Sequence, residues 1–219
     1  MAAGVNFLYP RRGFVPAAGL CAVVCGVLCA ALSPRAMGDS GSLSRVNVGA
    51  PAPAFSAPGA DGKRHRLSDF SGRIVVLEWT SPVCPYTAVK YQNGAMQALQ
   101  RYAAEHHAVW LSIDTAAANR AGYLSAAAAR TRIAETHARV SGFLFDLDGK
   151  IARSYGARTT PSFFIVDRHG QLAYEGAMDD ENGAAAQPKN YVRDALEDLG
   201  ANRPVRTPQT KPYGCGIEY

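Results

Sequence analysis

The sequence predicts an α/β fold, with a central mixed β-sheet flanked by helices and a β-hairpin extension at its N-terminal side. Three observations predict this fold. Strand-like and helix-like segments alternate over residues 74–199, which is typical of strands covered by helices. Residues 74–77 are an unbroken aliphatic run, as expected of a strand buried on both faces. A later strand opens at Thr160-Pro161 and turns back at His169-Gly170, so the sheet is expected to be mixed.

Residues 1–33 are predicted to be a signal peptide or an N-terminal membrane anchor. Arg11 and Arg12 precede an uncharged run over residues 13–32, which is the pattern of a secretory signal and is also about long enough to span a bilayer. The two arginines match a twin-arginine signal as well. The positive flank stays in the cytoplasm. We therefore expect an exported protein, periplasmic or anchored outside the cytoplasmic membrane, that contacts the membrane only through this segment.

The rest of the chain is predicted to hold one domain between a linker and a tail. Residues 34–45 are the expected linker, residues 46–200 the domain, and residues 201–219 the tail. Hydrophobic residues make up 47% of the chain, which is enough for a single core. The net charge is +5, but the basic residues are scattered and are not interleaved with aromatics. No nucleic-acid binding is expected.

The domain is predicted to open with a short hairpin. Asp61-Gly62-Lys63 is a tight-turn signal, and Phe55, Leu67 and Phe70 are expected to contact the core. Periodicity and turn residues place the later elements. The expected helices cover residues 85–107 with a break at Asn93-Gly94, 123–139, 150–155 and 191–199, and the expected strands cover 109–113, 143–146, 158–167 and 172–174.

Cys84 lies where the first strand of the sheet meets a helix. Thr80, Ser81 and Pro82 form turns readily, and Pro85 suits the first position of a helix. The thiol is therefore expected among the free N–H groups of the helix N-terminus, where an anion is favoured and a nucleophilic thiolate is stabilised. The alternative is an inert buried thiol, the usual fate of a free cysteine.

Five cysteines are present in the chain. Cys21, Cys25 and Cys29 lie in the apolar N-terminal run at four-residue spacing, but no His or carboxylate joins them. We therefore expect no metal site and no cofactor. Export leaves Cys84 and Cys215, and an oxidising compartment makes this pair a candidate disulfide.

Several motifs resemble the redoxin branch of the thioredoxin superfamily. The domain begins with G-x-x-A-P-x-F, D-G-K, L-S-D-F and R-I-V-V-L-E-W, and then joins a strand to a helix through Cys-Pro. The branch includes the AhpC/TSA peroxiredoxins and the exported thiol-disulfide oxidoreductases. The runs W-T-S-P-x-C-P-Y, Y-G-A-R-T-T-P and K-P-Y-G-C-x-I-x-Y resemble a bacterial group of peroxiredoxin-like proteins. The resemblance implies a thioredoxin-like fold and thiol redox chemistry.

Thr160-Pro161 resembles the cis-proline loop of this superfamily. Such a loop leaves main-chain polar groups free to pair with an extended substrate beside the reactive sulfur. Thr160 and Pro161, together with Trp79 and Pro85, are therefore expected to bind the substrate. The alternative is an ordinary trans proline at the start of a strand.

The resemblance also implies roles for three polar residues. Glu78 would be a buried acid with a raised pKa that acts as general base when a mixed disulfide resolves; pairing with an arginine is the alternative. Ser81 matches the Thr/Ser-x-x-Cys part of the peroxiredoxin motif, whose hydroxyl bonds thiolate and peroxide, although Leu77 stands where that motif has proline. Arg158 is a candidate for the cation aimed at the peroxide, or a surface arginine.

A second thiol is needed to release a mixed disulfide, and Thr87 stands where a Cys-x-x-Cys motif would supply it. Cys215 is the one internal candidate in the exported part. The tail after Leu199 is long enough to reach across a small domain, and Gly214 and Gly216 give its backbone freedom. A free tail thiol or an intermolecular link is the alternative.

These observations predict a thiol-based oxidoreductase of peroxiredoxin-like type. Cys84 would attack a peroxide or a protein disulfide, and Cys215 or an external thiol reductant, thioredoxin-like or membrane-linked, would resolve the product. The alternative is a non-catalytic binding module whose Cys84–Cys215 disulfide fastens the tail. Copper delivery is disfavoured, because the paired cysteines and the nearby histidine that it needs are missing. The acidic segment 177–190 is expected to be a solvated loop, with a partner site as the alternative.

Overall fold

A five-stranded mixed β-sheet organises the computed structural model, which describes residues 45–180 and 189–219. The strand order is β5-β4-β3-β7-β8, with β3, β4 and β5 parallel and β7 and β8 antiparallel to their neighbours. The strands are β3 (Val75–Thr80), β4 (Val109–Asp114), β5 (Gly142–Phe145), β7 (Ser162–Val166) and β8 (Leu172–Gly176). The predicted mixed sheet is confirmed.

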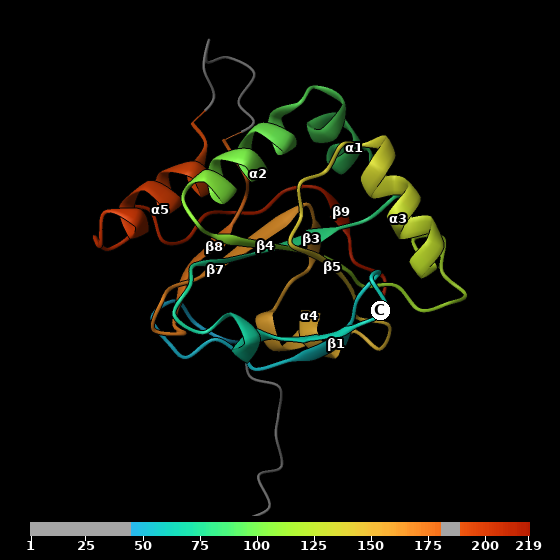
Figure 1. Cartoon of the computed structure of the whole chain (residues 1–219), viewed down its shortest axis with the longest axis horizontal. Helices are drawn as coiled ribbons and strands as arrows, with labels where there is room; N and C mark the ends of the chain where they lie inside the picture. The colour runs from blue at the N-terminus through green and yellow to red at the C-terminus, as the bar shows by residue number, and fades with distance from the viewer. Residues whose placement is uncertain (1–44, 181–188) are drawn as a thin grey trace, which may run out of the picture. The chain divides into compact units, whose positions relative to one another are not determined.

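Helices cover both faces of the sheet (Figure 1). One face carries α1 (Pro85–Gln92), α2 (Ala95–Glu105), α3 (Ala126–Glu135) and α5 (Tyr191–Gly200). The other face carries α4 (Lys150–Tyr155) and the hairpin of β1 (Ser56–Pro58) and β2 (Arg64–Arg66), which leads into the short 3-10 helix η1 (Leu67–Phe70).

The core lies in two layers, one on each face of the sheet. Val76 packs with side chains of α2 and α5, whereas Leu77 and Trp79 pack with those of α4. Phe55, Leu67 and Phe70 pack against the second layer as predicted. Because all six residues of β3 are buried, this strand is covered on both faces and gives the chain after Thr80 a fixed starting point.

Two of the predicted elements differ clearly from the observed ones. The helix expected over residues 123–139 begins at Ala126, because the Ser125 side chain caps it by accepting a hydrogen bond from Ala128 N, and it ends at Glu135. The strand expected over residues 158–167 is divided at Pro161 into β6 (Thr159–Thr160) and β7. The predicted helix break is confirmed, because α1 ends just before Asn93 and α2 begins just after Gly94.

Some predictions lie outside the residues that the structure describes. They concern the signal or anchor over residues 1–33 with its three cysteines, nearly all of the linker over 34–45, and the acidic segment where it covers 181–188. Among residues 45–180 and 189–219, no helix is long and apolar enough to span a membrane.

Candidate active site

Cys84 is the N-cap residue of α1, at the end of the turn that follows β3. Its backbone is extended, and its carbonyl accepts the first helical hydrogen bond, from Ala88 N at 3.0 Å. Pro85 occupies the first helical position. The Cys84 residue is 1% exposed. The predicted placement of this sulfur at a helix N-terminus is confirmed.

Cys84 is bonded to Cys215 of the tail. The two residues are 131 positions apart in sequence, and their Cα atoms are 5.8 Å apart. Cys215 belongs to β9 (Cys215–Gly216), which pairs antiparallel with β6 so that Cys215 lies opposite Thr160. The tail therefore brings Cys215 next to the start of α1.

The cis-proline loop completes this arrangement. The Thr160-Pro161 peptide bond is cis, as predicted. The Thr160 carbonyl oxygen lies 3.0 Å from Cys84 Sγ. One residue, Thr160, thus contacts the buried sulfur and pairs with the strand that carries the second sulfur.

Glu78 is fully buried on the face of the sheet that α1 and α2 cover. Its carboxylate accepts hydrogen bonds from Trp110 Nε1 at 2.7 Å, Ser112 Oγ at 2.7 Å and Tyr91 Oη at 3.0 Å. Burial raises the pKa of Glu78 despite these three donors. Within the described chain no arginine forms a salt bridge with Glu78, although the charge of Arg132 opposes the rise of its pKa. None of its three donors is a sulfur.

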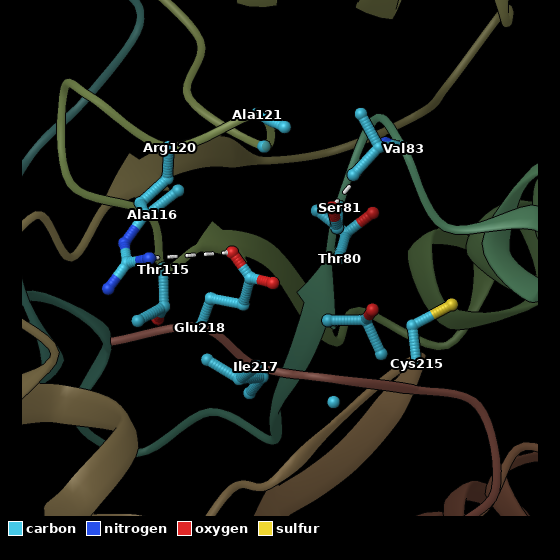
Figure 2. A pocket seen from close by; sticks show the side chains of 13 residues that line it. Thr80, Ser81, Val83, Thr115, Ala116, Arg120, Ala121, Cys215, Ile217 and Glu218 are labelled. Atoms are coloured by element: carbon cyan, nitrogen blue, oxygen red, sulfur yellow. Dashed lines mark hydrogen bonds and ion pairs between the residues drawn. The ribbon is translucent and has the colours of Figure 1, made fainter.

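A cavity of about 280 Å³ lies beside the disulfide. Figure 2 shows its walls: Ser81 and Val83 come from the β3–α1 turn, Arg120 from the loop before α3, and Cys215 and Glu218 from the tail. Ser81 Oγ accepts a hydrogen bond from Val83 N at 3.4 Å. Arg120 faces Glu218 at 3.9 Å. Cys215 lines this cavity and is partly exposed, whereas Cys84 does not line it and is buried. Cys215 is therefore the more accessible residue of the pair.

Comparison with family models matches residues 48–175 to the AhpC/TSA family. The matched segment holds the hairpin, Cys84 and the cis-proline loop, and it covers more than half of the chain. The chain belongs to the AhpC/TSA family. The resemblance to this redoxin branch of the thioredoxin superfamily is thereby confirmed.

Two solved structures share the fold of most of this AhpC/TSA protein. An uncharacterized conserved protein from Geobacillus kaustophilus is 26% identical with a TM-score of 0.70, over 79% of this chain and 92% of that one. A hypothetical protein from Sinorhizobium meliloti 1021 is 22% identical with a TM-score of 0.71, over 80% of this chain and 96% of that one. A secreted disulfide oxidoreductase of Mycobacterium tuberculosis is 20% identical with a TM-score of 0.47, over 68% and 95%. No curated protein matched the chain significantly.

Two residues expected at the site of this AhpC/TSA protein lie elsewhere. Trp79 is a core residue, because its fully buried ring packs on Phe164 at 5.0 Å and its Nε1 donates to Thr115 Oγ1 at 3.1 Å. The expectation that it binds substrate is therefore wrong. The side chain of Arg158 is exposed and does not line the cavity; its carbonyl instead accepts a hydrogen bond from Ile217 N at 2.9 Å.

Sequence reasoning missed three residues around the disulfide. Arg120 lines the cavity, and no motif distinguishes it from the other scattered arginines. Tyr213 and Tyr219 hold the tail on either side of Cys215 by hydrogen bonds to Asp179 and to the Ala157 carbonyl. A signal for both tyrosines was present, since the run K-P-Y-G-C-G-I-E-Y places an aromatic residue on each side of the cysteine.

Asp114 is a further buried acid close to this site. It ends β4 next to Thr115, which lines the cavity. Burial raises the pKa of Asp114 to about 7, although a hydrogen bond from Leu124 N opposes the shift. In the part of the chain that the structure describes, no group of three His, Cys, Asp or Glu side chains is arranged to hold a metal ion.

Proposed function

We propose that this AhpC/TSA protein is an exported thiol oxidoreductase that cycles between two free thiols and the Cys84–Cys215 disulfide. One observation carries the proposal: the disulfide joins the first turn of α1 to a tail strand that is paired with the cis-proline loop. A thiolate at a helix N-terminus is stabilised and nucleophilic at neutral pH. Pro85, exposed beside Cys84, and Pro161 are proposed to border the substrate.

In the oxidising half of the cycle, the Cys84 thiolate attacks a hydroperoxide. An S–O bond forms, the O–O bond breaks, and an alcohol or water leaves after protonation. The Cys215 thiol then attacks the sulfenic sulfur, so that an S–S bond forms, the S–O bond breaks, and water leaves. We assign Ser81, at the cavity wall, to hold the peroxide. We assign Glu78, with its raised pKa, to accept the proton of the Cys215 thiol as this thiol attacks the sulfenic acid.

In the reducing half, an external thiolate attacks Cys215 rather than Cys84. Cys215 is partly exposed and lines the cavity, whereas Cys84 is buried. The departing Cys84 thiolate is the better leaving group because its helix N-terminus stabilises it. A second thiol of the donor then attacks the donor sulfur of this mixed disulfide. The S–S bond to Cys215 breaks, Cys215 leaves as a thiolate, and the donor becomes a disulfide. The proposed donor is a thioredoxin-like or membrane-linked dithiol.

A second candidate function is favoured by the burial of Cys84. A disulfide-bonded residue that is only 1% exposed is also expected of a structural crosslink. The protein would then be a binding module in which the disulfide fastens the tail, and neither peroxide nor a disulfide substrate would be consumed.

The experiment that separates these functions follows hydrogen peroxide consumption by the reduced protein together with a non-reducing peptide map. For an oxidoreductase, the wild type consumes one equivalent and yields the Cys84–Cys215 peptide. Cys215→Ser stops at a sulfenic acid on Cys84 that dimedone traps, and Cys84→Ser consumes none. A wild type that ignores peroxide and keeps its disulfide at strongly reducing potentials would instead establish the binding module.

A further inference from the structure

The tail of this protein occupies the position that a polypeptide substrate would need. β9 pairs antiparallel with β6, and Cys215 lies opposite Thr160. An extended peptide that binds beside the reactive sulfur uses the same main-chain groups, since it adds as a strand to a free edge. Here the protein's own chain already pairs with that edge.

The fit between the tail and the loop is close because residue 214 is glycine. Its φ is +132°, a conformation that side-chain-bearing residues rarely adopt. A Cβ at this position would overlap the Thr160 carbonyl group. The tail backbone therefore lies directly against the cis-proline loop.

On the N-terminal side of Cys215, Tyr213 fastens the tail to the domain without using either sulfur. Its hydroxyl donates a hydrogen bond to Asp179. Its ring centre lies 6.0 Å from that of Tyr86 and 5.7 Å from Lys90 Nζ. Lys90 in turn pairs with Asp179 at 2.9 Å. This cluster joins the tail to α1 and to the segment after β8.

On the C-terminal side, Ile217 and Tyr219 fasten the tail again. Ile217 N donates to Arg158 O at 2.9 Å, and the Ile217 side chain packs against the core. Tyr219 donates from its hydroxyl to the Ala157 carbonyl, and the Arg153 guanidinium lies 4.4 Å from its ring centre. Cys215 thus sits between two anchors that remain when the disulfide is opened.

Contacts further upstream extend this attachment along the tail. Thr210 N donates to Glu175 O at 3.0 Å, and Thr210 Oγ1 accepts from Ala177 N at 2.9 Å. Near the start of the tail, Arg206 pairs with Asp198 of α5 at 2.9 Å. The attachment extends over residues 206–219 rather than being concentrated at the sulfur.

We infer that the tail stays docked in the reduced protein and thereby restricts the oxidant to small hydroperoxides, excluding polypeptide disulfides. This inference rests on the proposed redox function of the thiol pair. A polypeptide would have to displace β9 before its disulfide could reach Cys84. A small hydroperoxide would enter the cavity of about 280 Å³ that Ser81, Thr160 and Cys215 line, which borders the sulfur pair on its Cys215 side, without displacing β9. The balanced reaction converts ROOH and two thiols into ROH, water and the disulfide.

The test compares two oxidants on the reduced full-length protein. One is tert-butyl hydroperoxide, and the other is a ten-residue extended peptide whose central cysteine is disulfide-bonded to a second peptide. We expect the wild type to react with the hydroperoxide at least a hundredfold faster than with the peptide. If it reacts with neither, the proposed function fails; if it reacts with the peptide as readily as with the hydroperoxide, only the present inference fails.

A variant with a loosened tail makes the test stricter. Tyr213→Ala combined with Tyr219→Ala removes an anchor on each side of Cys215 and leaves both thiols in place. We expect its rate with the peptide to rise more than tenfold, while its rate with the hydroperoxide does not rise. Tyr102→Ala is the matched control, because it removes a tyrosine that lies 4.4 Å from Arg193, away from the tail, and should change neither rate.

Hydrogen exchange tests the docked tail independently of any substrate. In Cys215→Ser, which cannot form the disulfide, the amide of Ile217 should remain protected through its bond to Arg158. Exchange of this amide at the rate of an unstructured peptide would overturn the inference. The inference would also be overturned if the loosened variant gave the circular dichroism spectrum of a folded protein but gained no reactivity with the peptide.

Discussion

At the scale of one residue, burial changes the pKa of Asp114 and therefore its charge at neutral pH. Its carboxyl has a pKa of about 7 in the folded protein, against an ordinary value of 3.8, because burial disfavours the anion. As pH rises from about 4 to 7, the unfolded chain releases this proton and the folded chain keeps it. The contribution of Asp114 to folding stability therefore falls over this range and stays low above it.

The corresponding prediction is that Asp114→Asn stabilises the protein more at pH 8 than at pH 5. The gain should grow by about 2–3 kcal/mol between these values, from about 1.4 kcal/mol for each unit of pKa. Urea unfolding at both pH values measures it. Asp148→Asn is the control, because the pKa of the exposed Asp148 is lowered by Lys150 and the change should bring no gain at pH 8. An equal gain of Asp114→Asn at both pH values would contradict the prediction.

Glu78 gives a second prediction at this scale, on the rate of disulfide formation. Glu78→Gln removes the proposed proton acceptor, so the step from sulfenic acid to disulfide should slow roughly tenfold to hundredfold at pH 7, while sulfenic acid formation is unchanged. Rapid-quench alkylation separates the two steps. In Tyr91→Phe the carboxylate remains but loses a hydrogen bond that lowers its pKa. The pH profile of the step should therefore shift upward instead of disappearing.

Sequence reasoning at the residue scale succeeded where a residue type has one physical use. Pro85 after Cys84 predicts a helix start, and Thr160-Pro161 predicts the loop, because proline tolerates few other positions. It failed for Trp79, because a strand buried on both faces gives no alternation that separates a core side chain from a site side chain. It also named Arg158 and missed Arg120, since the cavity wall is formed by segments distant in sequence.

At the scale of elements, the pairing of β6 with β9 depends on Gly214. Its positive φ and its contact with the Thr160 carbonyl leave no space for a side chain. We predict that Gly214→Ala lifts β9 and slows disulfide formation at least tenfold. The rate of disulfide formation would be measured by alkylating the cysteines that remain free after a peroxide pulse.

Gly216 provides the matched control for this prediction. A Cβ there would meet no atom within 4 Å, so Gly216→Ala should form the disulfide at close to the wild-type rate. Equal rates for the two variants would show that β9 does not position Cys215. The sequence suggested freedom at both glycines, but only the partner strand reveals that Gly214 is the one in a confined position.

The elements themselves were largely predictable, whereas their long-range contacts were not. The break between α1 and α2 follows from Asn93-Gly94, and Gly94 indeed has a φ of +78°. The tail was expected only to be long enough to reach Cys84. Its route depends on Tyr213 meeting Asp179 and on Tyr219 meeting Arg153, pairings that no local pattern encodes.

At the scale of the whole molecule, the disulfide closes a loop of 131 positions. A crosslink over such a loop stabilises a fold by up to about 5 kcal/mol when it restricts the unfolded chain. We predict that a reductant lowers the thermal midpoint of the wild type by ten degrees or more. The same reductant should leave the midpoint of Cys215→Ser unchanged, as measured by differential scanning calorimetry. A reductant effect of equal size in Cys215→Ser would contradict the assignment to this bond.

The route of the tail has a consequence for solubility. β8 is one of the two edge strands of the sheet, and residues 208–210 bond to its Glu175 through Pro208 O and Thr210 N, each at 3.0 Å. An uncovered outer strand offers unpaired backbone groups to other molecules and promotes aggregation. The segment that carries the second thiol therefore also shields this strand. Loss of the tail would increase self-association as well as remove the second thiol.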